Sequence, residues 1–573
     1  MLSHLTFHEQ PALLLTVVLP ASIVFGYGIW YAVQWYFFIG AYKHWKKLPP
    51  GPKSGRFSGT PGYPRVKHHI YFKELADTYG EIYSVWAGPT LQVVLNTPKA
   101  IRTLCDSRGA IYNDRPKMYA FHDRIFRGIS IVSTGYGDLW RKQRRIFTSL
   151  TSITRSKKLL PYQEYESKQY VFDMLKSPDD FFLHTERYGS SVLTSVVYGL
   201  RADDITDPAA QGLILMGTWL EANLLPGKYL DDRWPVLQRL PDILAPWRKV
   251  YRENAELLDM IARAWWNPAK IRAKNGRSDH CFAMDFLETY TAEGFNEDEA
   301  ALIALGLMLA GAGTTGAIQN FLIMGCALNP HVVQKAHEEL DRIVGRNRLP
   351  DLSDEPNLPY VRAIIKETMR WRPFSNQGFY HATTKEDWYD GYYIPAGTTV
   401  VANAYSIHFD AKRHPNPEKF DPERFINYPL GANEYANMKD GEKRDHFAYG
   451  AGRRICAGLP VAETSLFLLS SRLLWGFNIT RRKDEAGNTI PVDTMNYEAD
   501  EDEDGVFAKP RPYAAKIEVR GPEFAAVISD TFKDAKTDLS SLGEAFRAGE
   551  MGSMQSVCDI LKNHPDVVPH LPS

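Results

Sequence analysis

The sequence lacks an excess of charge of either sign, and it lacks a cysteine framework. Lys and Arg number 67 against 68 Asp and Glu, so the formal net charge is −1. Nucleic-acid binders usually carry a basic excess, and no nucleic-acid partner is expected. The cysteines are odd in number and scattered without CxxC spacing: Cys105, Cys281, Cys326, Cys456 and Cys558. This pattern indicates a reducing compartment, with neither disulfides nor a zinc cluster.

The N-terminus lacks charge altogether over a long apolar run. Residues 10–42 contain no Asp, Glu, Lys or Arg, and about 20 apolar residues suffice to span a bilayer. A cleaved signal peptide would have a basic region before a shorter apolar core. A core helix of this length without a polar face would be unusual. We therefore expect residues 1–45 to form a membrane anchor, with one transmembrane helix over about residues 12–36.

Basic residues follow this span rather than precede it: Lys43, Lys46, Lys47, Lys53 and Arg56. The positively charged flank of a membrane span stays in the cytosol. The bulk of the chain is therefore predicted to face the cytosol, which agrees with the cysteine pattern.

Beyond the anchor the sequence predicts a mainly α fold with a minor β region. A Pro- and Gly-rich stretch over 46–64 forms a stiff, extended hinge. Helical periodicity dominates from about 68 to 480, while "YSVWAG", "LQVVLN" and "TTVVANA" have the character of strands. We expect one large domain over 46–523 and a C-terminal extension of unknown role over 524–573.

One cysteine, Cys456, lies among glycines and arginines in "FAYGAGRRICAGLP" (Phe447–Pro460). Glycines on both sides of Cys456 suit a backbone that turns tightly or lets a large flat group approach. The following residues predict a helix, which places Cys456 near a helix N-terminus and beside Arg453 and Arg454. Both features lower the pKa of a thiol and favour the thiolate.

A thiolate at this place has three possible uses. A nucleophile needs a histidine base, and zinc needs further Cys or His ligands; the local sequence supplies neither. A single thiolate suffices when a porphyrin supplies the other ligands of a metal. That arrangement is haem-thiolate chemistry.

The stretch "YGAGRRICAG" (Tyr449–Gly458) resembles the haem-binding signature of cytochromes P450, FxxGxRxCxG. Tyr449 stands where Phe is usual, which keeps an aromatic ring. The resemblance implies haem b as cofactor, Cys456 as the axial ligand of its iron, and Arg454 as the partner of a haem propionate.

A second segment, "KETMRWRP", carries Glu367 and Arg370, which share one face of a predicted helix. An exposed pair of this kind contributes little, but the apolar surroundings indicate burial. The segment resembles the ExxR motif of the same family, and "FDPERF" places Arg424 where the family has the third member of the set. The resemblance implies a structural role for the three residues, which hold the loop around the cysteine.

A third segment is "ALIALGLMLAGAGTTGAIQNF". Asn296 and Glu299 before it have the spacing of a capping box, and the apolar run predicts a central buried helix. The small residues of "AGAGTT" either leave room for a ligand or allow close helix packing. The segment resembles the P450 oxygen-binding groove, AGx(D/E)T. Thr314 matches the catalytic threonine, but Gly313 stands where an acid is usual.

Further haem contacts follow from the resemblance. Trp140 and Arg144 in "YGDLWRKQRRIF" are four residues apart on a predicted helix and match a WxxxR element that reaches a propionate. His381 falls where the family commonly has a third propionate partner, although a lone histidine is more often part of the fold.

These matches keep the family order from about residue 48 to 520 and resemble fungal, microsomal P450 monooxygenases. The resemblance implies insertion of one oxygen atom from O2 into a lipophilic small molecule, such as a terpenoid or polyketide of secondary metabolism. It also implies a single-pass protein of the endoplasmic reticulum membrane. The chain has no flavin or nicotinamide fingerprint, so a membrane-bound NADPH–cytochrome P450 reductase is the expected electron donor.

Two surfaces are predicted from the family arrangement. A basic patch on the cysteine side would steer the acidic reductase: Arg141, Lys142, Arg145 and Arg453. Three segments would contact the substrate: residues 121–132, Phe374–Phe379 and Gly505–Phe507. Their apolar to mixed character suits a lipophilic molecule.

Two alternatives stay open. Gly313 cannot relay a proton, so the enzyme could instead catalyse a rearrangement, a dehydration or an oxidative coupling. The chain could also be a haem sensor or carrier without turnover, which NADPH consumption with the reductase would distinguish from an enzyme.

Overall fold

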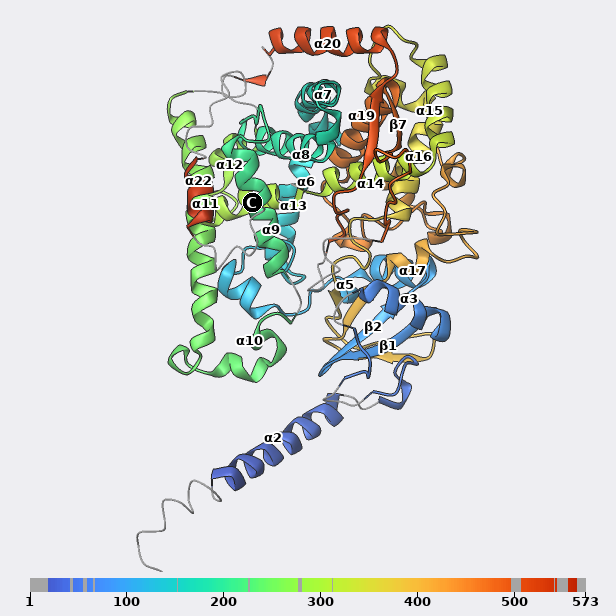
Figure 1. The fold of residues 1–573 in the computed structure, drawn as a ribbon. Helices are drawn as coiled ribbons and strands as arrows, with labels where there is room; N and C mark the ends of the chain where they lie inside the picture. The colour runs from blue at the N-terminus through green and yellow to red at the C-terminus, as the bar shows by residue number, and fades with distance from the viewer. Residues whose placement is uncertain are drawn as a thin grey trace, which may run out of the picture.

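The computed structural model describes residues 19–41, 45–54, 59–64, 67–151, 153–224, 227–276, 281–311, 313–495, 507–539, 542–543 and 555–563. Most of this chain is helical, and its small sheets lie apart from one another around the helical body (Figure 1). The predicted fold class, mainly α with a minor β region, is therefore confirmed.

The main sheet contains all three strands predicted from the sequence. Its order is β1 (Ile82–Ala87), β2 (Thr90–Leu95), β6 (Thr399–Ala402) and β3 (His381–Ala382). β2 runs antiparallel to β1 and parallel to β6. Short strands pair elsewhere in two further sheets: β4 (Asp387–Tyr389) with β5 (Tyr392–Ile394), and β7 (Phe477–Arg481) with β8 (Ala515–Val519).

The helical body is built around two central apolar helices, α13 (Glu297–Gly311) and α14 (Thr314–Leu328). Both are apolar around most of their circumference, which is typical of helices buried on every side. The stretch Glu297–Leu328 is long and apolar enough to cross a membrane, but most of it is buried inside the protein. It is therefore the core of the fold.

Further helices surround this pair. The longer ones are α3 (His68–Tyr79), α6 (Asp138–Thr151), α7 (Ile153–Lys176), α8 (Phe181–Tyr198), α9 (Pro208–Asn223), α11 (Lys249–Lys274), α12 (Phe282–Thr289), α15 (Pro330–Ile343), α16 (Pro359–Trp371) and α19 (Leu459–Gly476). The shorter ones are α4 (Pro98–Ile101), α5 (Gly109–Tyr112), α10 (Leu230–Arg233), α17 (Ala404–His408) and α18 (Ala432–Ala436). The capping box predicted before α13 is present, with Asn296 and Glu299 each accepting from the other's backbone N–H at 2.9 Å.

The central helix predicted from the sequence is described in two parts, α13 ending at Gly311 and α14 beginning at Thr314, with Gly313 in a turn just before Thr314. Glycines around this break permit close packing on α8. A Cβ at Gly311 would lie 2.7 Å from Leu193, and one at Gly316 would lie 3.2 Å from the Thr185 carbonyl oxygen. Close helix packing therefore accounts for Gly311 and Gly316. Gly313 instead lies beside Lys509 and is described with the candidate active site.

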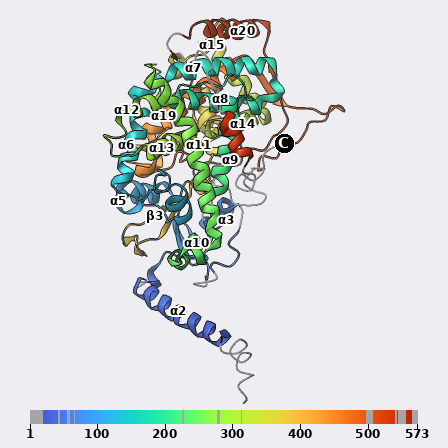
Figure 2. The same cartoon turned by 90° about the vertical axis from the view of Figure 1, so that its left-hand side faces the viewer.

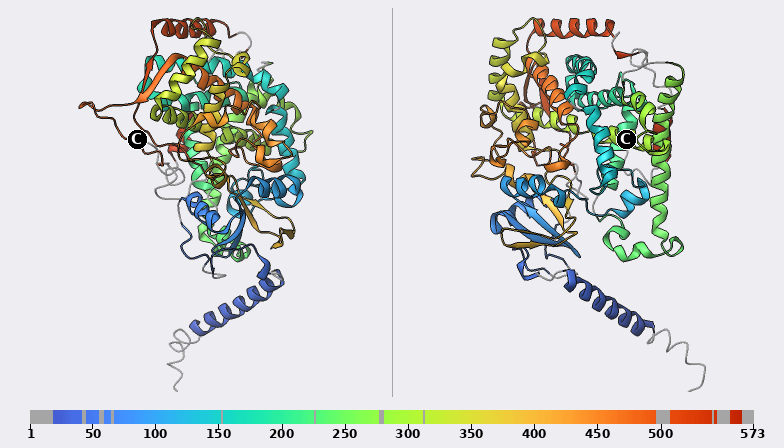
Figure 3. Two further views of the ribbon diagram at one scale, coloured as in Figure 1. Left: turned by 90° about the vertical axis from the view of Figure 1, so that its right-hand side faces the viewer. Right: turned by 180° about the vertical axis from the view of Figure 1, so that it is seen from behind.

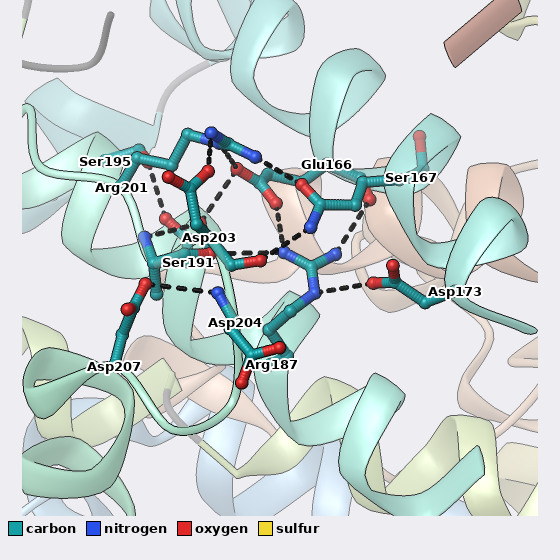
Figure 4. A network of polar contacts seen from close by, with 12 residues as sticks. Glu166, Ser167, Asp173, Arg187, Ser191, Ser195, Arg201, Asp203, Asp204 and Asp207 are labelled. Atoms are coloured by element: carbon teal, nitrogen blue, oxygen red, sulfur yellow. Dashed lines mark hydrogen bonds and ion pairs between the residues drawn. The ribbon is translucent and has the colours of Figure 1, made fainter. Parts of the chain in front are cut away.

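A buried ionic network fixes α8 against α7 (Figure 4). Arg187 donates to Glu166 at 2.6 Å and to Asp173 at 2.9 Å, and Arg201 lies 3.3 Å from the second oxygen of Glu166. The Ser191 hydroxyl also donates to Glu166, at 2.8 Å. Because α14 packs on α8, this network helps to position α14.

The N-terminal helix α2 (Leu19–Ala41) projects away from the rest of the molecule in every view (Figures 1 and 3). It contains no charged residue, and its side chains over 19–29 are exposed. Residues 12–18 of the predicted span lie outside the described residues, as do Lys43 and Arg56 of its flank.

The described parts of the C-terminal extension pack on the helical body. In α20 (Pro522–Thr537), the Phe532 ring lies 4.7 Å from that of Phe172 on α7. In α22 (Gln555–Lys562), Val557 is fully buried against Gly212 of α9. Figures 1 and 2 show α22 in red beside α11.

Candidate active site

The loop before Cys456 turns tightly at two glycines, as the sequence predicted. Gly450 and Gly452 have positive φ values of 76° and 66°. A Cβ at Gly452 would lie 2.3 Å from the Cys105 carbonyl oxygen, so no other residue fits without moving the loop. The loop is closed by hydrogen bonds from Cys456 N to Tyr449 O at 2.9 Å and from Gly452 N to the Asp106 carboxylate at 2.7 Å.

Cys456 lies just before α19, as predicted, but the pKa of its thiol is raised rather than lowered. Burial is the largest cause and outweighs the backbone N–H groups of Gly458 and Leu459 and the charge of Arg144, which lower the pKa. From the sequence we had expected Arg453 and Arg454, rather than Arg144, to be the cations that lower the pKa of this thiol. Cys456 still has accessible surface, unlike Cys105, Cys281, Cys326 and Cys558, which are buried.

Glu367, Arg370 and Arg424 form one buried cluster. Glu367 and Arg370, on α16, are fully buried and joined by two hydrogen bonds of 2.7 and 2.8 Å. Arg424, in the turn η10 (Pro422–Phe425), lies 3.5 Å from the same carboxylate. Glu367 also accepts from Asp421 N at 2.8 Å, so the cluster binds the turn to α16.

The cluster reaches the cysteine loop through His408, which the sequence analysis missed. Arg370 donates to the His408 carbonyl oxygen at 2.9 Å, and the His408 ring nitrogen Nε2 accepts from Phe447 N at 2.8 Å. A second contact joins Lys366 of α16 to Asp445, at 2.5 Å. These bonds attach the start of the cysteine loop to α16.

Trp140 and Arg144 lie on α6, as predicted, and face the cysteine region. Arg144 is close enough to Cys456 for their charges to interact, and burial lowers the pKa of its guanidinium. This guanidinium forms no hydrogen bond or ion pair within the part of the chain that the structure describes. Arg454 stacks over the Trp140 ring at 4.4 Å and donates to the carbonyl oxygens of Asn113 and Thr134.

Arg115 joins this group and was missed, because nothing in the linear sequence distinguishes it from other arginines. It donates to the carbonyl oxygens of Val132, Phe379 and Tyr380 at 2.8, 3.0 and 2.7 Å. Burial lowers its pKa to about 10. His381, buried on β3, contacts the Tyr112 carbonyl oxygen at 2.9 Å.

Arg115, Arg144 and Arg454 form a guanidinium cluster whose positive charges are incompletely balanced by nearby carboxylates. Burial and Arg115 lower the pKa of Arg454 to about 8, which Asp114 only partly offsets. Burial, and then Arg115, lower the pKa of His381 to about 3. Buried cations that repel one another favour an anion between them. Guanidinium groups are suited to binding carboxylates, so thiol and cluster together fit the iron and the two propionates of haem.

Thr314 and Gly313 lie at the break between α13 and α14, partly exposed. A Cβ on Gly313 would lie 3.3 Å from Cε and 3.5 Å from Nζ of Lys509. Lys509 in turn forms an ion pair with Glu221 of α9. Neither Lys509 nor Glu221 was predicted as a site residue, because both lie far from Gly313 and from each other in the sequence.

The structure brings two of the three predicted substrate segments together. The Phe507 ring stacks on Phe374 at 4.6 Å and lies 5.7 Å from Phe379; Gly505 and Val506 lie outside the described residues. The 121–132 segment reaches Phe379 through Arg115, which donates to both Val132 and Phe379. One turn beyond Thr314, Ile318 packs against Phe374 and Tyr449 of the cysteine loop.

The predicted basic patch divides into two pairs. The guanidinium groups of Arg141 and Arg453 both lie over the Tyr136 ring, at 5.2 and 5.3 Å from its centre. Lys142 and Arg145 both contact Glu293, whose carboxylate pairs with Arg145. Arg141 and Arg453 are therefore two exposed cations that share one aromatic neighbour beside the cysteine loop.

Comparisons with known proteins agree on one family. The sequence model of the family described as cytochrome P450 matches residues 49–495. Two fungal relatives are cytochrome P450 monooxygenase virE of Hypocrea virens, 34% identical over 85% of this chain and 88% of the relative, and polD of Polytolypa hystricis, 37% identical over 82% and 89%. A zebrafish cytochrome P450 structure with progesterone is similar in fold, with a TM-score of 0.63 and 24% identity, over 79% of this chain and 99% of that one.

Proposed function

The chain belongs to the cytochrome P450 family, and from this premise we propose that it inserts one oxygen atom from O2 into a lipophilic small molecule. The family consists of haem-thiolate proteins, and the relatives above are named as monooxygenases. Bound haem supplies the oxygen-activating chemistry, which a thiolate ligand promotes. The observation that carries the proposal is the accessible thiol of Cys456 close to the under-compensated guanidinium cluster.

Each predicted site residue has a role in this proposal. Cys456 is the ligand of the iron, and a metal-bound thiol is deprotonated whatever its pKa in the free chain. Propionate binding is assigned to a set on four elements: Trp140, Arg144, His381, Arg454 and, from the structure, Arg115. Thr314 is the proposed catalytic threonine: it lies at the break between α13 and α14, where its hydroxyl can donate a hydrogen bond during catalysis. Glu367, Arg370 and Arg424 position the cysteine loop from behind.

The substrate is proposed to be a terpenoid or polyketide intermediate of fungal secondary metabolism. The stacked rings of Phe374, Phe379 and Phe507 give an aromatic wall, and apolar pockets with few polar groups bind lipophilic molecules. The fungal origin of the monooxygenase relatives supports the biological assignment.

Electrons are proposed to come from NADPH–cytochrome P450 reductase, docked beside the cysteine loop. The exposed pair Arg141 and Arg453 supports this placement, because a cationic patch steers an acidic partner.

We place the protein in the endoplasmic reticulum membrane, with α2 as a single-pass anchor and the catalytic domain, residues 46–523, in the cytosol. At about 1.5 Å per residue, the 23 residues of α2 are about 34 Å long, enough for a bilayer core. Lys46 and Lys47 follow the helix on the side assigned to the cytosol.

Two measurements test the function. The purified chain, reduced and exposed to carbon monoxide, should show the red-shifted Soret band that a thiolate ligand gives, and Cys456→Ser should lose this red shift. Metabolites of the source organism with and without the gene should then differ by one oxygen between the accumulated compound and the lost product. A Cys456→Ser protein with an unchanged spectrum would contradict the assignment of the ligand.

A second candidate reaction is a rearrangement, a dehydration or an oxidative coupling, favoured by Gly313 in place of an acid. In Gly313→Asp, the new carboxylate would lie beside Lys509. If peroxide release and product pattern both stay the same in this variant, the missing acid has no mechanistic meaning. A product of unchanged mass, or one lighter by water or by two hydrogens, would favour the second candidate.

A further inference from the structure

Gly313 faces an ion pair built from two distant elements. Lys509 lies in the extended segment before β8, and Glu221 lies near the C-terminal end of α9. The two side chains are 24% and 25% exposed, so neither is a surface group and neither is sealed off. The absence of a side chain at Gly313 leaves the space that the Lys509 ammonium approaches.

The surroundings of this pair are apolar. Phe507 and Lys509 belong to the same segment, two residues apart. Phe507 stacks on Phe374, and the segment is fixed there by a hydrogen bond from Ala508 N to Phe374 O at 2.7 Å. On the other side of the break in the central helix, Gly311 packs on Leu193. A partly buried ion pair in such a place is a weak source of stability.

The charges of the pair restrict the ligand that it can receive. Together Lys509 and Glu221 are neutral and offer N–H donors beside carboxylate acceptors. A hydroxyl accepts from Lys509 while it donates to Glu221, and a carbonyl accepts from Lys509 alone. A carboxylate would bring a third charge, which Glu221 repels in a region of low polarity.

We propose that Lys509 and Glu221 form a recognition site for a neutral oxygen substituent, a hydroxyl or a carbonyl, on the otherwise apolar substrate. This inference rests on the proposed function and narrows its substrate class to lipophilic alcohols and ketones rather than hydrocarbons or free acids. The pair thereby orients the molecule beside Gly313.

The test uses ligands anchored at the haem, so it does not depend on the natural substrate. The probes are 1-alkylimidazoles of increasing chain length whose tails end in a methyl, a hydroxyl or a carboxylate. Their dissociation constants are measured from the Soret shift of the holoenzyme. At one chain length the hydroxyl probe should bind about tenfold more tightly than the methyl probe, the equivalent of one good hydrogen bond, and the carboxylate probe should show no gain.

The double variant Lys509→Met with Glu221→Leu removes the site without leaving a buried charge unpaired, so it should fold. It should bind hydroxyl and methyl probes equally, while Lys516→Met with Glu518→Leu, an exposed Lys–Glu pair on β8, should keep the difference. The proposal would be overturned if, at every chain length, the ratio of the dissociation constants of the methyl and hydroxyl probes were the same in the wild type and the double variant. A failure of every imidazole to shift the Soret band would instead overturn the proposed haem function.

Discussion

At the scale of single residues, the position of Cys456 depends on the backbone around it. The loop is fixed at Gly452 by a left-handed conformation and by contact with the Cys105 carbonyl oxygen. Two of its hydrogen bonds are made to residues far away in the sequence, at Asp106 and His408. The glycines of the motif therefore serve a backbone contact that the motif itself does not contain.

Gly452→Ala should lower the haem content of the purified protein severalfold. The substitution costs roughly 1–2 kcal/mol for the left-handed conformation, and its Cβ also meets the Cys105 backbone. Haem content is measured by the carbon monoxide difference spectrum per unit of protein.

Gly487→Ala is the matched control, because Gly487 also has a positive φ, 84°, but no atom lies within 4 Å of its added Cβ. If both variants lose haem equally, the contact with Cys105 is irrelevant and only the backbone conformation matters.

At the scale of elements, the buried ionic network between α7 and α8 contributes more to the free energy of unfolding than the surface ion pairs do. Arg187→Met leaves Glu166 without its closest cation in a fully buried site. Removing one partner of a buried pair typically costs about 3–5 kcal/mol. We expect a loss of that size in the free energy of unfolding, measured by denaturant titration.

The comparison is Arg482→Met, which breaks an exposed pair with Asp179 and should cost less than about 1 kcal/mol. Similar losses in the two variants would show that Arg201 alone neutralises Glu166 and that Arg187 is dispensable.

The C-terminal helix α22 has too few residues to be stable alone, so its order must come from its contacts with α9 and α11. Val557→Asp places a carboxylate in a fully buried site against Gly212. Burying an unpaired charge costs several kcal/mol, and α22 should detach. Hydrogen exchange should then rise in α22 and along the α9 face that it covers.

Asn563→Ala, an exposed position one residue beyond α22, should leave this exchange unchanged. Wild-type protection of α9 in Val557→Asp would mean that α22 contributes nothing to the order of that helix.

At the scale of the whole molecule, five buried histidines make stability depend on pH. Burial lowers their pKa values, to about 3 or 4 for four of them and well below 6.5 for the fifth: His69, His381, His414, His446 and His408. Between these values and 6.5 the unfolded chain binds protons that the folded chain does not. Their contribution to stability is therefore present above pH 6.5 and lost as the pH falls toward 4.

The melting temperature should accordingly fall as the pH drops from 6.5 to 4, and His414→Leu should reduce the slope. A folded pKa of about 3 corresponds to a cost of about 2 kcal/mol for that histidine at pH 5. His331→Leu, at an exposed position, should leave the slope as it is. An unchanged slope in His414→Leu would mean that His414 is not a source of the acid sensitivity.

The exposed cations beside the cysteine loop predict a salt-dependent encounter with the proposed reductase. Reversing Arg141 together with its exposed neighbour Lys142, in Arg141→Glu with Lys142→Glu, should slow reduction by about tenfold or more at low salt, and the difference should shrink as salt screens the charges. Stopped-flow reduction under carbon monoxide measures the rate. Lys516→Glu with Lys536→Glu, on β8 and α20, serves as the control. A normal rate in the first variant at low salt would remove the proposed docking surface.

Features that depend on short spacing could be predicted from the amino-acid sequence alone. The Cys456 loop, the Glu367–Arg370 pair and the Trp140–Arg144 helix each lie within about one or two helical turns, where residue spacing fixes which side chains share a face. The same holds for the strands of the main sheet and for the capping box before α13. The apolar N-terminal run predicted a helix for the same reason.

The contacts between distant groups depend on how the whole chain folds and could not be predicted. Arg115 and Arg454 share the charge cluster, His408 carries the contact from Arg370 to the cysteine loop, and Lys509 lies beside Gly313. Burial also reversed the expected shift in the pKa of the Cys456 thiol. These outcomes depend on how helices pack and on how much water is excluded. Both are set by contacts between residues that are tens to hundreds of positions apart, and local spacing carries no information about such contacts.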